Sequence, residues 1–179
     1  MIILVGKTCS GKSTVANIIE KEYNIPRVKT YTTRPRREGE GDEYHFVSEK
    51  EFFDLQSEDF FFETTSYKVS NGDTWYYGTP KKELVDNCCI VMNPEGMKKI
   101  RHFLDLTDFD ILIIYLNVTE GMQYSRLRQR GDVSDEATRR IEADAKDFAD
   151  IGEYYNLSIN TECFAPEEIA KIIMFLMRV

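Results

Sequence analysis

The order of apolar and polar stretches along the chain predicts short buried strands that alternate with amphipathic helices. The apolar runs are short and rich in β-branched side chains, which is typical of buried parallel strands. They lie at 2–5, 88–92, 111–116 and 157–160. Helical spacing follows at 12–23, at 95–104, at 119–131, from Ser134 and from Pro166. This alternation predicts an α/β fold with three layers around a central parallel sheet.

The region from residue 31 to residue 80 departs from this alternation. Strands are expected at 44–47 and 60–63, with a short helix between them that begins at a capping box. Asn71-Gly72 between two aromatic-rich runs predicts a β-hairpin. Thr79 followed by Pro80 predicts the start of another short helix, and a brief strand is expected at 28–30. We therefore expect a small β-rich insertion in the α/β core.

The first strand leads directly into a glycine-containing loop and a helix. Gly6-Lys7-Thr8-Cys9-Ser10-Gly11-Lys12-Ser13 matches the spacing G-x-x-x-x-G-K-[ST]. Between a strand and a helix, such a loop forms a nest of backbone N–H groups that holds a polyphosphate. Lys12 would lie along the β- and γ-phosphates, and the Ser13 hydroxyl would ligate Mg²⁺. The pattern predicts that the loop and the adjoining Thr14 bind ATP, with Ser13 as the metal ligand.

Composition narrows the range of partners. With 179 residues, the chain is long enough for one well-buried core. A net charge of −8 argues against a long nucleic-acid footprint, and no apolar run approaches the ~20 residues of a membrane span. The four cysteines show neither metal spacing nor a C-x-x-C pair, and no leader is recognisable before the first strand. We expect a cytoplasmic protein with reduced thiols that binds neither a nucleic-acid polymer nor a membrane.

Two arginine clusters are candidate anion sites. The first comprises Arg34, Arg36 and Arg37, with Tyr44 nearby; the second comprises Arg126, Arg128, Arg130, Arg139 and Arg140. Guanidinium groups grip phosphate bidentately, and phosphoryl transfer needs cations that close on the developing charge. The alternatives are a solvated linker for the first cluster and a solvated helix for the second. Glu63, which follows three phenylalanines, could accept the two parallel N–H donors that guanine offers.

Together these residues resemble the guanylate kinase family of nucleoside monophosphate kinases. The most specific stretches are the glycine loop, Thr32-Thr33-Arg34 through Gly39-Glu40 to Tyr44, Phe62-Glu63, Tyr77-Gly78-Thr79, and Arg126-Leu127 to Arg130-Gly131 followed by Arg140. The resemblance implies a P-loop NTPase core, a β-rich insertion that binds a nucleoside monophosphate, and a helical lid. It implies one domain with its core at 1–30, 81–124 and 153–179, its insertion at 31–80 and its lid at 125–152.

The resemblance also implies roles for individual residues. The GMP phosphate would be held by Arg34, Arg37, Tyr44 and Tyr77. Guanine would be read by Glu63, assisted by the hydroxyls of Thr30 and Thr79. Lys12 and the lid arginines Arg126, Arg130 and Arg140 would act on the transferring phosphoryl group, and Asn160 would lie beside the donor adenine.

The chain departs from the family pattern at two positions near the end of the strand at 88–92. Where the family has aspartates, this sequence has Val91 and Asn93. The expected reaction is ATP-dependent phosphorylation of GMP or dGMP. The departures leave two alternatives, which are a kinase for a different nucleotide or a sugar phosphate, and a nucleotide-binding interaction module with little turnover.

Overall fold

The computed structural model describes residues 1–37, 40–69, 71–104, 110–132 and 134–177. The chain divides into two compact units, of which the first comprises Met1–Arg27 and Asp86–Val179 and the second Val28–Val85. The insertion expected at 31–80 falls within the second unit. No helix among the described residues has both the length and the apolar character needed to cross a bilayer.

The first unit contains a parallel sheet in the order β6-β1-β7-β8. Its described strands are β1 (Ile2–Gly6), β6 (Cys89–Met92), β7 (Leu112–Asn117) and β8 (Leu157–Asn160). β1 pairs in parallel with β6 on one side and with β7 on the other, and β7 pairs in parallel with β8. The predicted α/β class with a central parallel sheet is therefore confirmed.

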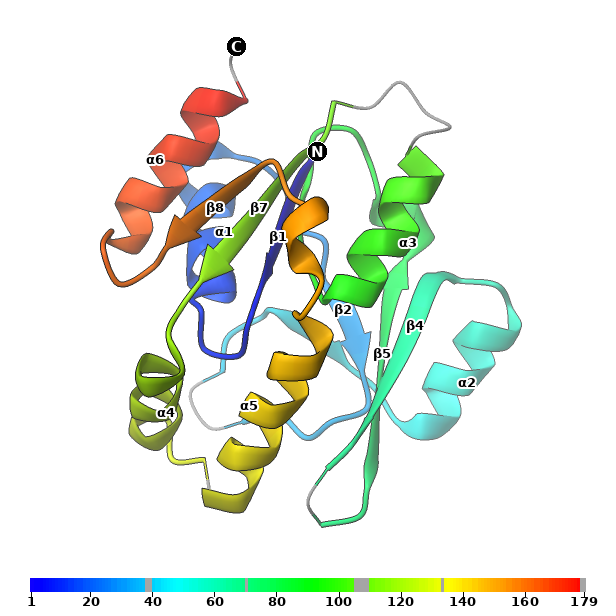
Figure 1. The fold of residues 1–179 in the computed structure, drawn as a ribbon. Helices are drawn as coiled ribbons and strands as arrows, with labels where there is room; N and C mark the ends of the chain where they lie inside the picture. The colour runs from blue at the N-terminus through cyan, green and yellow to red at the C-terminus, as the bar shows by residue number, and fades with distance from the viewer. Residues whose placement is uncertain (38–39, 70, 105–109, 133, 178–179) are drawn as a thin grey trace. The chain divides into compact units, whose positions relative to one another are not determined.

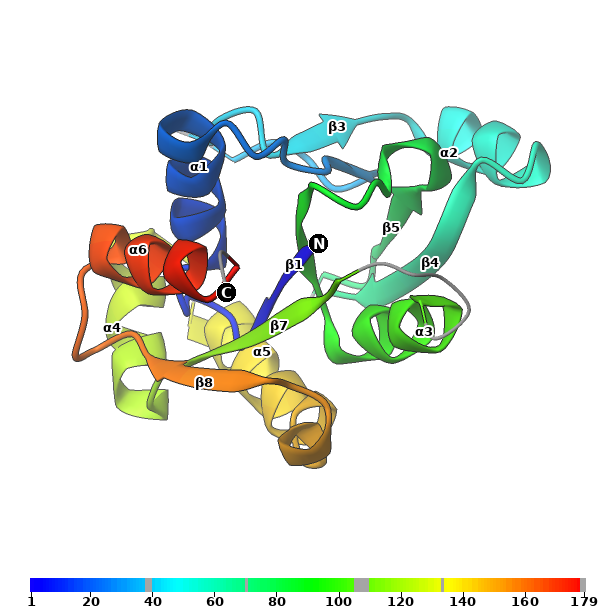
Figure 2. The same cartoon turned by 90° about the horizontal axis from the view of Figure 1, so that it is seen from above.

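Helices cover both faces of this sheet, as Figures 1 and 2 show. α1 (Lys12–Tyr23) and α6 (Pro166–Leu176) lie on one face, and α3 (Pro94–Leu104) lies on the other. Alternate residues of β1 divide between the faces: Ile2 and Leu4 pack with α1 and α6, whereas Ile3 and Val5 point the other way. Both sets are buried, as the continuous apolar run predicts.

Two further helices of this unit form the region predicted as a lid. α4 (Glu120–Gln129) begins at Thr119, whose side chain accepts a hydrogen bond from Met122 N, and the chain turns at Gly131 with φ of 81°. α5 (Ser134–Asp147) follows, with a 3₁₀ turn, η2 (Ile151–Glu153), after it. Leu127, Ala137 and Ile141 make a small apolar cluster between α4 and α5.

The second unit is built on a mixed sheet in the order β3-β2-β5-β4. Its described elements are β2 (Thr30–Thr32), β3 (Tyr44–Phe46), α2 (Glu49–Ser57), β4 (Phe61–Lys68), β5 (Thr74–Pro80) and η1 (Lys81–Glu83). β4 and β5 form the predicted hairpin, with Gly72 at φ of 94° in the turn. The buried Phe52 of α2 stacks on Phe61 with ring centroids 4.8 Å apart, so α2 covers one face of this sheet.

Three local predictions in this unit are wrong. The strand expected at 28–30 lies at Thr30–Thr32, and the strand expected at 60–63 continues to Lys68. Thr79 and Pro80 do not begin a helix, because they remain in β5 and pair with Glu63 and Phe61 of β4. Cross-strand pairing thus overrides the local helix-start signal, and the chain turns only at Lys81.

Gly78 provides a test of the packing in the second unit. A Cβ at this position would lie 2.7 Å from the Phe61 ring, which is held by Phe52 on its other side. We expect Gly78→Ala to lower the free energy of unfolding by about 1–3 kcal/mol, the usual cost of overpacking. Gly121→Ala is the matched control, because nothing lies within 4 Å of its added Cβ and the residue is helical. Urea denaturation should show equal or higher stability for the control; an unaffected Gly78→Ala would contradict this packing.

Candidate active site

The loop from Gly6 to Gly11 joins β1 to α1 and is built around close backbone contacts. A Cβ on Gly6 would lie 2.5 Å from the carbonyl oxygen of Leu116 and 2.6 Å from Ser10 Oγ, so only glycine fits there. Gly11 has φ of 87° and Cys9 has φ of 59°. Ser10 N donates to the Lys7 carbonyl at 3.1 Å and closes the loop. Gly11 precedes α1 without a side-chain cap, which leaves the first amides of the helix to other acceptors.

Lys12 lies against this loop and is held by it. Its Nζ donates to the carbonyl oxygens of Gly6 at 2.6 Å and Lys7 at 2.8 Å, with Ser10 Oγ at 3.4 Å. Burial of the ammonium lowers the pKa of Lys12 to about 8, against an opposing effect of Asp144. The loop carbonyls therefore accept hydrogen bonds from the buried ammonium and orient it.

Ser13, the predicted metal ligand, lies in the first turn of α1. The buried Arg27 reaches it, with Nη2 3.5 Å from Ser13 Oγ and Nη1 2.5 Å from Asn17 Oδ1. The described residues contain no group of three or more His, Cys, Asp or Glu side chains that could hold a metal ion. One hydroxyl beside a phosphate loop suits Mg²⁺, which is usually bound by few protein ligands together with substrate phosphates.

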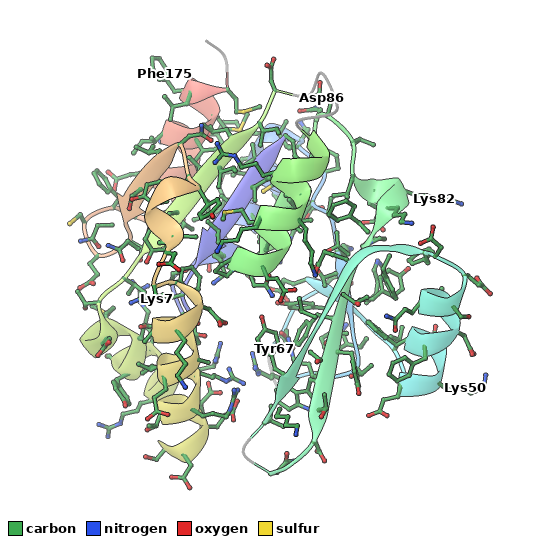
Figure 3. All side chains as sticks on the ribbon, turned by 45° about the vertical axis from the view of Figure 1, so that its right-hand side comes forward. Lys7, Lys50, Tyr67, Lys82, Asp86 and Phe175 are labelled. Carbon is green, nitrogen blue, oxygen red and sulfur yellow. The ribbon has the colours of Figure 1, made fainter. Side chains whose placement is uncertain are left out.

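The helices α4 and α5 contact the loop through three polar side chains. Arg126 Nη1 donates to the Cys9 carbonyl at 2.9 Å, and its Nη2 donates to the Thr161 carbonyl at 3.2 Å. The buried Gln123 donates from Nε2 to the Thr8 carbonyl at 3.1 Å. Asp144 Oδ2 accepts hydrogen bonds from Thr8 N at 2.7 Å and from Gln123 Nε2 at 2.8 Å. Figure 3 shows Lys7 of the loop beside α5.

The other predicted lid arginines are paired with carboxylates on or next to α5. Arg130 Nε lies 2.6 Å from Asp132 Oδ2, and Arg140 Nη1 lies 3.4 Å from Asp132 Oδ1. Arg140 Nε also donates to Glu136 Oε1 at 2.7 Å. Although Arg126 and Arg130 are one turn apart in the sequence, Arg126 reaches the loop and Arg130 reaches Asp132.

Glu136 lies at the centre of this ion-pair network. Arg139 donates to both of its carboxylate oxygens, at 2.7 and 2.9 Å, in addition to the bond from Arg140. The hydrogen bonds from Arg139, followed by those from Arg140, lower the pKa of Glu136 to about 2 against the opposing effect of burial. The carboxylate is therefore held ionised at neutral pH.

Asn160, predicted to lie beside the donor base, ends β8. Its Oδ1 accepts from Glu162 N at 2.9 Å, and its side chain is exposed. This hydrogen bond stabilises the turn that directly follows β8.

In the second unit, the arginine-rich loop is organised around Glu40. The buried Arg34 forms a bidentate pair with Glu40, and its Nη1 also donates to the Pro35 carbonyl at 2.9 Å. Arg37 N donates to Glu40 Oε2 at 3.0 Å. Burial raises the pKa of Glu40, but the hydrogen bonds from Arg34 and Arg37 outweigh it and hold that pKa below its ordinary value. Arg34 lies over the Tyr44 ring, 4.9 Å from its centroid.

The remaining predicted substrate residues share one face of the second sheet. Strand register and alternation bring Thr30, Tyr44, Glu63, Tyr77 and Thr79 to the face opposite α2. The rings of Tyr44 and Tyr77 meet edge to face with centroids 6.3 Å apart, and burial raises the pKa of Tyr77. Thr79 Oγ1 donates to Glu63 Oε1 at 2.7 Å.

A β-bulge aims Glu63 at this face. Phe61 pairs with Pro80, yet Glu63 pairs with Thr79, so one extra residue of β4 is accommodated between them. Without the extra residue, Phe62 would lie opposite Thr79. The bulge therefore gives Glu63 its hydroxyl partner.

The sequence analysis does not identify Gln123, Asp144 or Thr161. Asp144 lies 136 residues beyond Thr8 and Gln123 lies 115 residues beyond it, so no motif spacing connects them with the loop. An aspartate in a charged helix is typical of a solvated face. The helix α4 contains two glutamines, Gln123 and Gln129, and no pattern in the sequence distinguishes the one that reaches the loop.

Comparisons of the whole chain with known proteins identify one family. The family profile described as Guanylate kinase matches residues 1–175. A guanylate kinase from Agrobacterium fabrum is 28% identical over 148 residues, which cover 78% of this chain and 64%, or slightly less than two thirds, of that protein. A guanylate kinase from Blochmanniella floridana is 31% identical over 172 residues, covering 89% of this chain and 78% of the relative.

Solved structures agree with this result. The crystal structure of guanylate kinase from Anaplasma phagocytophilum is similar to this chain with a TM-score of 0.66 and 27% identity, covering 99% of this chain and 84% of that protein. The YorR protein of Bacillus subtilis, solved in complex with phosphorylated GDP, has a TM-score of 0.58 at 20% identity, and this likeness concerns the fold alone.

The Glu136 network predicts a pH dependence of stability. Because the folded-state pKa is about 2 and the ordinary value is 4.5, the ionised carboxylate stabilises the fold fully above pH 4.5. This contribution is lost as the pH falls from 4.5 towards 2. Thermal melting should show a smaller loss over this window for Glu136→Gln than for the wild type. Glu142→Gln, which changes an exposed residue of the same helix, should retain the wild-type pH dependence.

Proposed function

The chain belongs to the guanylate kinase family, and we propose from this membership that it transfers the γ-phosphoryl group of ATP to GMP or dGMP, with ADP and GDP or dGDP as products. The observation that carries the proposal is the pairing of Glu63 with Thr79 in one unit of a chain whose other unit has an intact phosphate loop. A carboxylate oriented by a hydroxyl is suited to guanine, and the loop is suited to a nucleoside triphosphate.

The donor nucleotide is assigned to the loop between β1 and α1. Its phosphates would bind the backbone amides of residues 6–14, Lys12 would neutralise the β- and γ-phosphates, and Asn160 would lie beside adenine. Bound Mg²⁺ supplies further charge neutralisation to the phosphates, and Ser13 is the residue that would hold it. Support comes from the uncapped N-terminus of α1 and from the ammonium of Lys12, which the loop itself orients.

The acceptor is assigned to the sheet face of the second unit opposite α2. Glu63 would accept hydrogen bonds from guanine N1–H and the exocyclic amine, with Thr79 and Thr30 as supporting hydroxyls. Arg34, Arg37, Tyr44 and Tyr77 would bind the acceptor phosphate. The guanidinium of Arg34 engages an anionic group, the Glu40 carboxylate, which supports its assignment to anion binding.

The reaction needs little covalent chemistry from the protein. An acceptor phosphate oxygen attacks the γ-phosphorus, the bond from that phosphorus to the β–γ bridging oxygen breaks, and ADP leaves with the bonding electrons. The attacking oxygen is already anionic, so no general base is required. Arg126, Arg130 and Arg140 would stabilise the charge on the transferring group and help to exclude water, which otherwise hydrolyses ATP.

A different nucleotide or a sugar phosphate is the second candidate acceptor. It is favoured by Val91, which is apolar, and by Asn93, whose Oδ1 accepts from Gly96 N at 2.7 Å at the start of α3. Neither side chain supplies the carboxylate that the family pattern has at these positions.

A coupled assay of ATP consumption against a panel of nucleoside monophosphates tests the proposed reaction. We expect selective turnover with GMP or dGMP, and we expect Lys12→Ala to lower kcat by at least about 100-fold because it removes transition-state charge stabilisation. The circular dichroism spectrum should stay unchanged. Turnover with another acceptor would favour the second candidate, whereas tight ATP binding with no acceptor-dependent turnover would indicate an interaction module.

Glu63→Gln tests how guanine is recognised. The amide retains one acceptor but replaces the other with a donor that opposes guanine, so we expect KM for GMP to rise roughly tenfold or more, the cost of a mismatched buried polar group. The KM for ATP should not change. Glu49→Gln, on the exposed surface of α2, is the charge-matched control. Unchanged GMP kinetics in Glu63→Gln would show that another residue reads the base.

A further inference from the structure

A carboxylate from α5 occupies a backbone amide of the phosphate loop. Asp144 Oδ2 accepts from Thr8 N at 2.7 Å, although the two residues are 136 positions apart in the sequence. Backbone amides of a phosphate loop are donors for anionic oxygens of a polyphosphate. The loop therefore already binds one anionic oxygen, which comes from the chain itself.

Asp144 is held in this position by Gln123 of α4. Gln123 is fully buried, and its Nε2 donates both to Asp144 Oδ2 at 2.8 Å and to the Thr8 carbonyl at 3.1 Å. Two acceptors on one side define which end of the amide is the nitrogen. The opposite end, Gln123 Oε1, is buried and has no hydrogen-bond partner among the described residues. A buried acceptor without a partner costs free energy, so the arrangement contains an unfavourable contribution that a rearrangement could remove.

The charge of Asp144 also acts on Lys12. Its field favours the protonated ammonium, which in this structure is directed to the carbonyl oxygens of Gly6 and Lys7. The terminal phosphates of a bound triphosphate require the same ammonium and the same loop. A carboxylate this close repels them, because like charges at short distance in a partly buried site are poorly screened.

We propose that Asp144 competes with the donor's phosphates for the loop. Binding of the triphosphate displaces the Asp144 carboxylate and thereby frees α5 from Thr8. This inference rests on the proposed function, since it assigns the loop to a nucleoside triphosphate. Because α5 also bears Arg140, the displacement couples occupation of the loop to the helix that carries this predicted lid arginine.

The test is the affinity of the loop for ATP and for inorganic tripolyphosphate, measured by titration calorimetry at pH 7 with Asp144→Asn. We expect the Kd of both ligands to fall roughly tenfold in the variant, because one negative charge is removed from the loop. In steady-state assays, KM for ATP should fall while kcat changes little. Asp144→Glu, which restores the charge, should bring the Kd back towards the wild-type value.

Glu142→Gln is the control, because it removes the same charge from an exposed position on the same helix and should leave both Kd values unchanged. If Asp144→Asn does not fold, Gln123→Met releases the carboxylate while keeping the side-chain volume, and the same fall in Kd is expected. Unchanged or weaker ATP binding in a folded variant would overturn the role of Asp144. Failure of the wild type to bind ATP would instead overturn the proposed function.

Discussion

The close contact between Gly6 and the carbonyl oxygen of Leu116 is the constraint on which the phosphate loop depends. β1 and β7 are neighbours in the sheet, and the chain leaves β1 at a point where a Cβ would collide with β7. Glycine therefore lets the loop turn at the carboxyl end of β1, with Ser10 buried behind it. The carbonyls of residues 6 and 7 then face Lys12 and accept hydrogen bonds from its ammonium.

Carboxylates of the chain itself neutralise the cations assigned to phosphate binding. Glu40 pairs with Arg34 in the second unit, and Glu136 pairs with Arg140 in the first. A guanidinium that is partly buried needs an anionic partner, because desolvation without one is costly. The acidic character of the chain, with a net charge of −8, is thus compatible with anion binding at particular sites. Anion binding depends on the local partner of each arginine and not on the net charge of the chain.

The proposed recognition of the acceptor depends in the same way on a detail of backbone geometry. The bulge in β4 moves Glu63 into register with Thr79, and the pleat then gives it the same face as Tyr77. The opposite face packs on Phe52 of α2. The sheet of the second unit therefore has one face that packs on α2 and an opposite face that carries the proposed acceptor-binding residues.

The sequence by itself determined the parallel α/β core, the phosphate loop and the helix at Lys12–Tyr23, because buried runs, glycine spacing and caps are local signals. Through the family resemblance, the sequence also indicated the candidate residues of both units. Their roles stay predictions. Only the tertiary structure decided that Thr79 stays in a strand, that a bulge directs Glu63, and that Asp144 reaches Thr8. Those contacts join residues far apart in the chain, and their energies arise only once the strands and helices are packed.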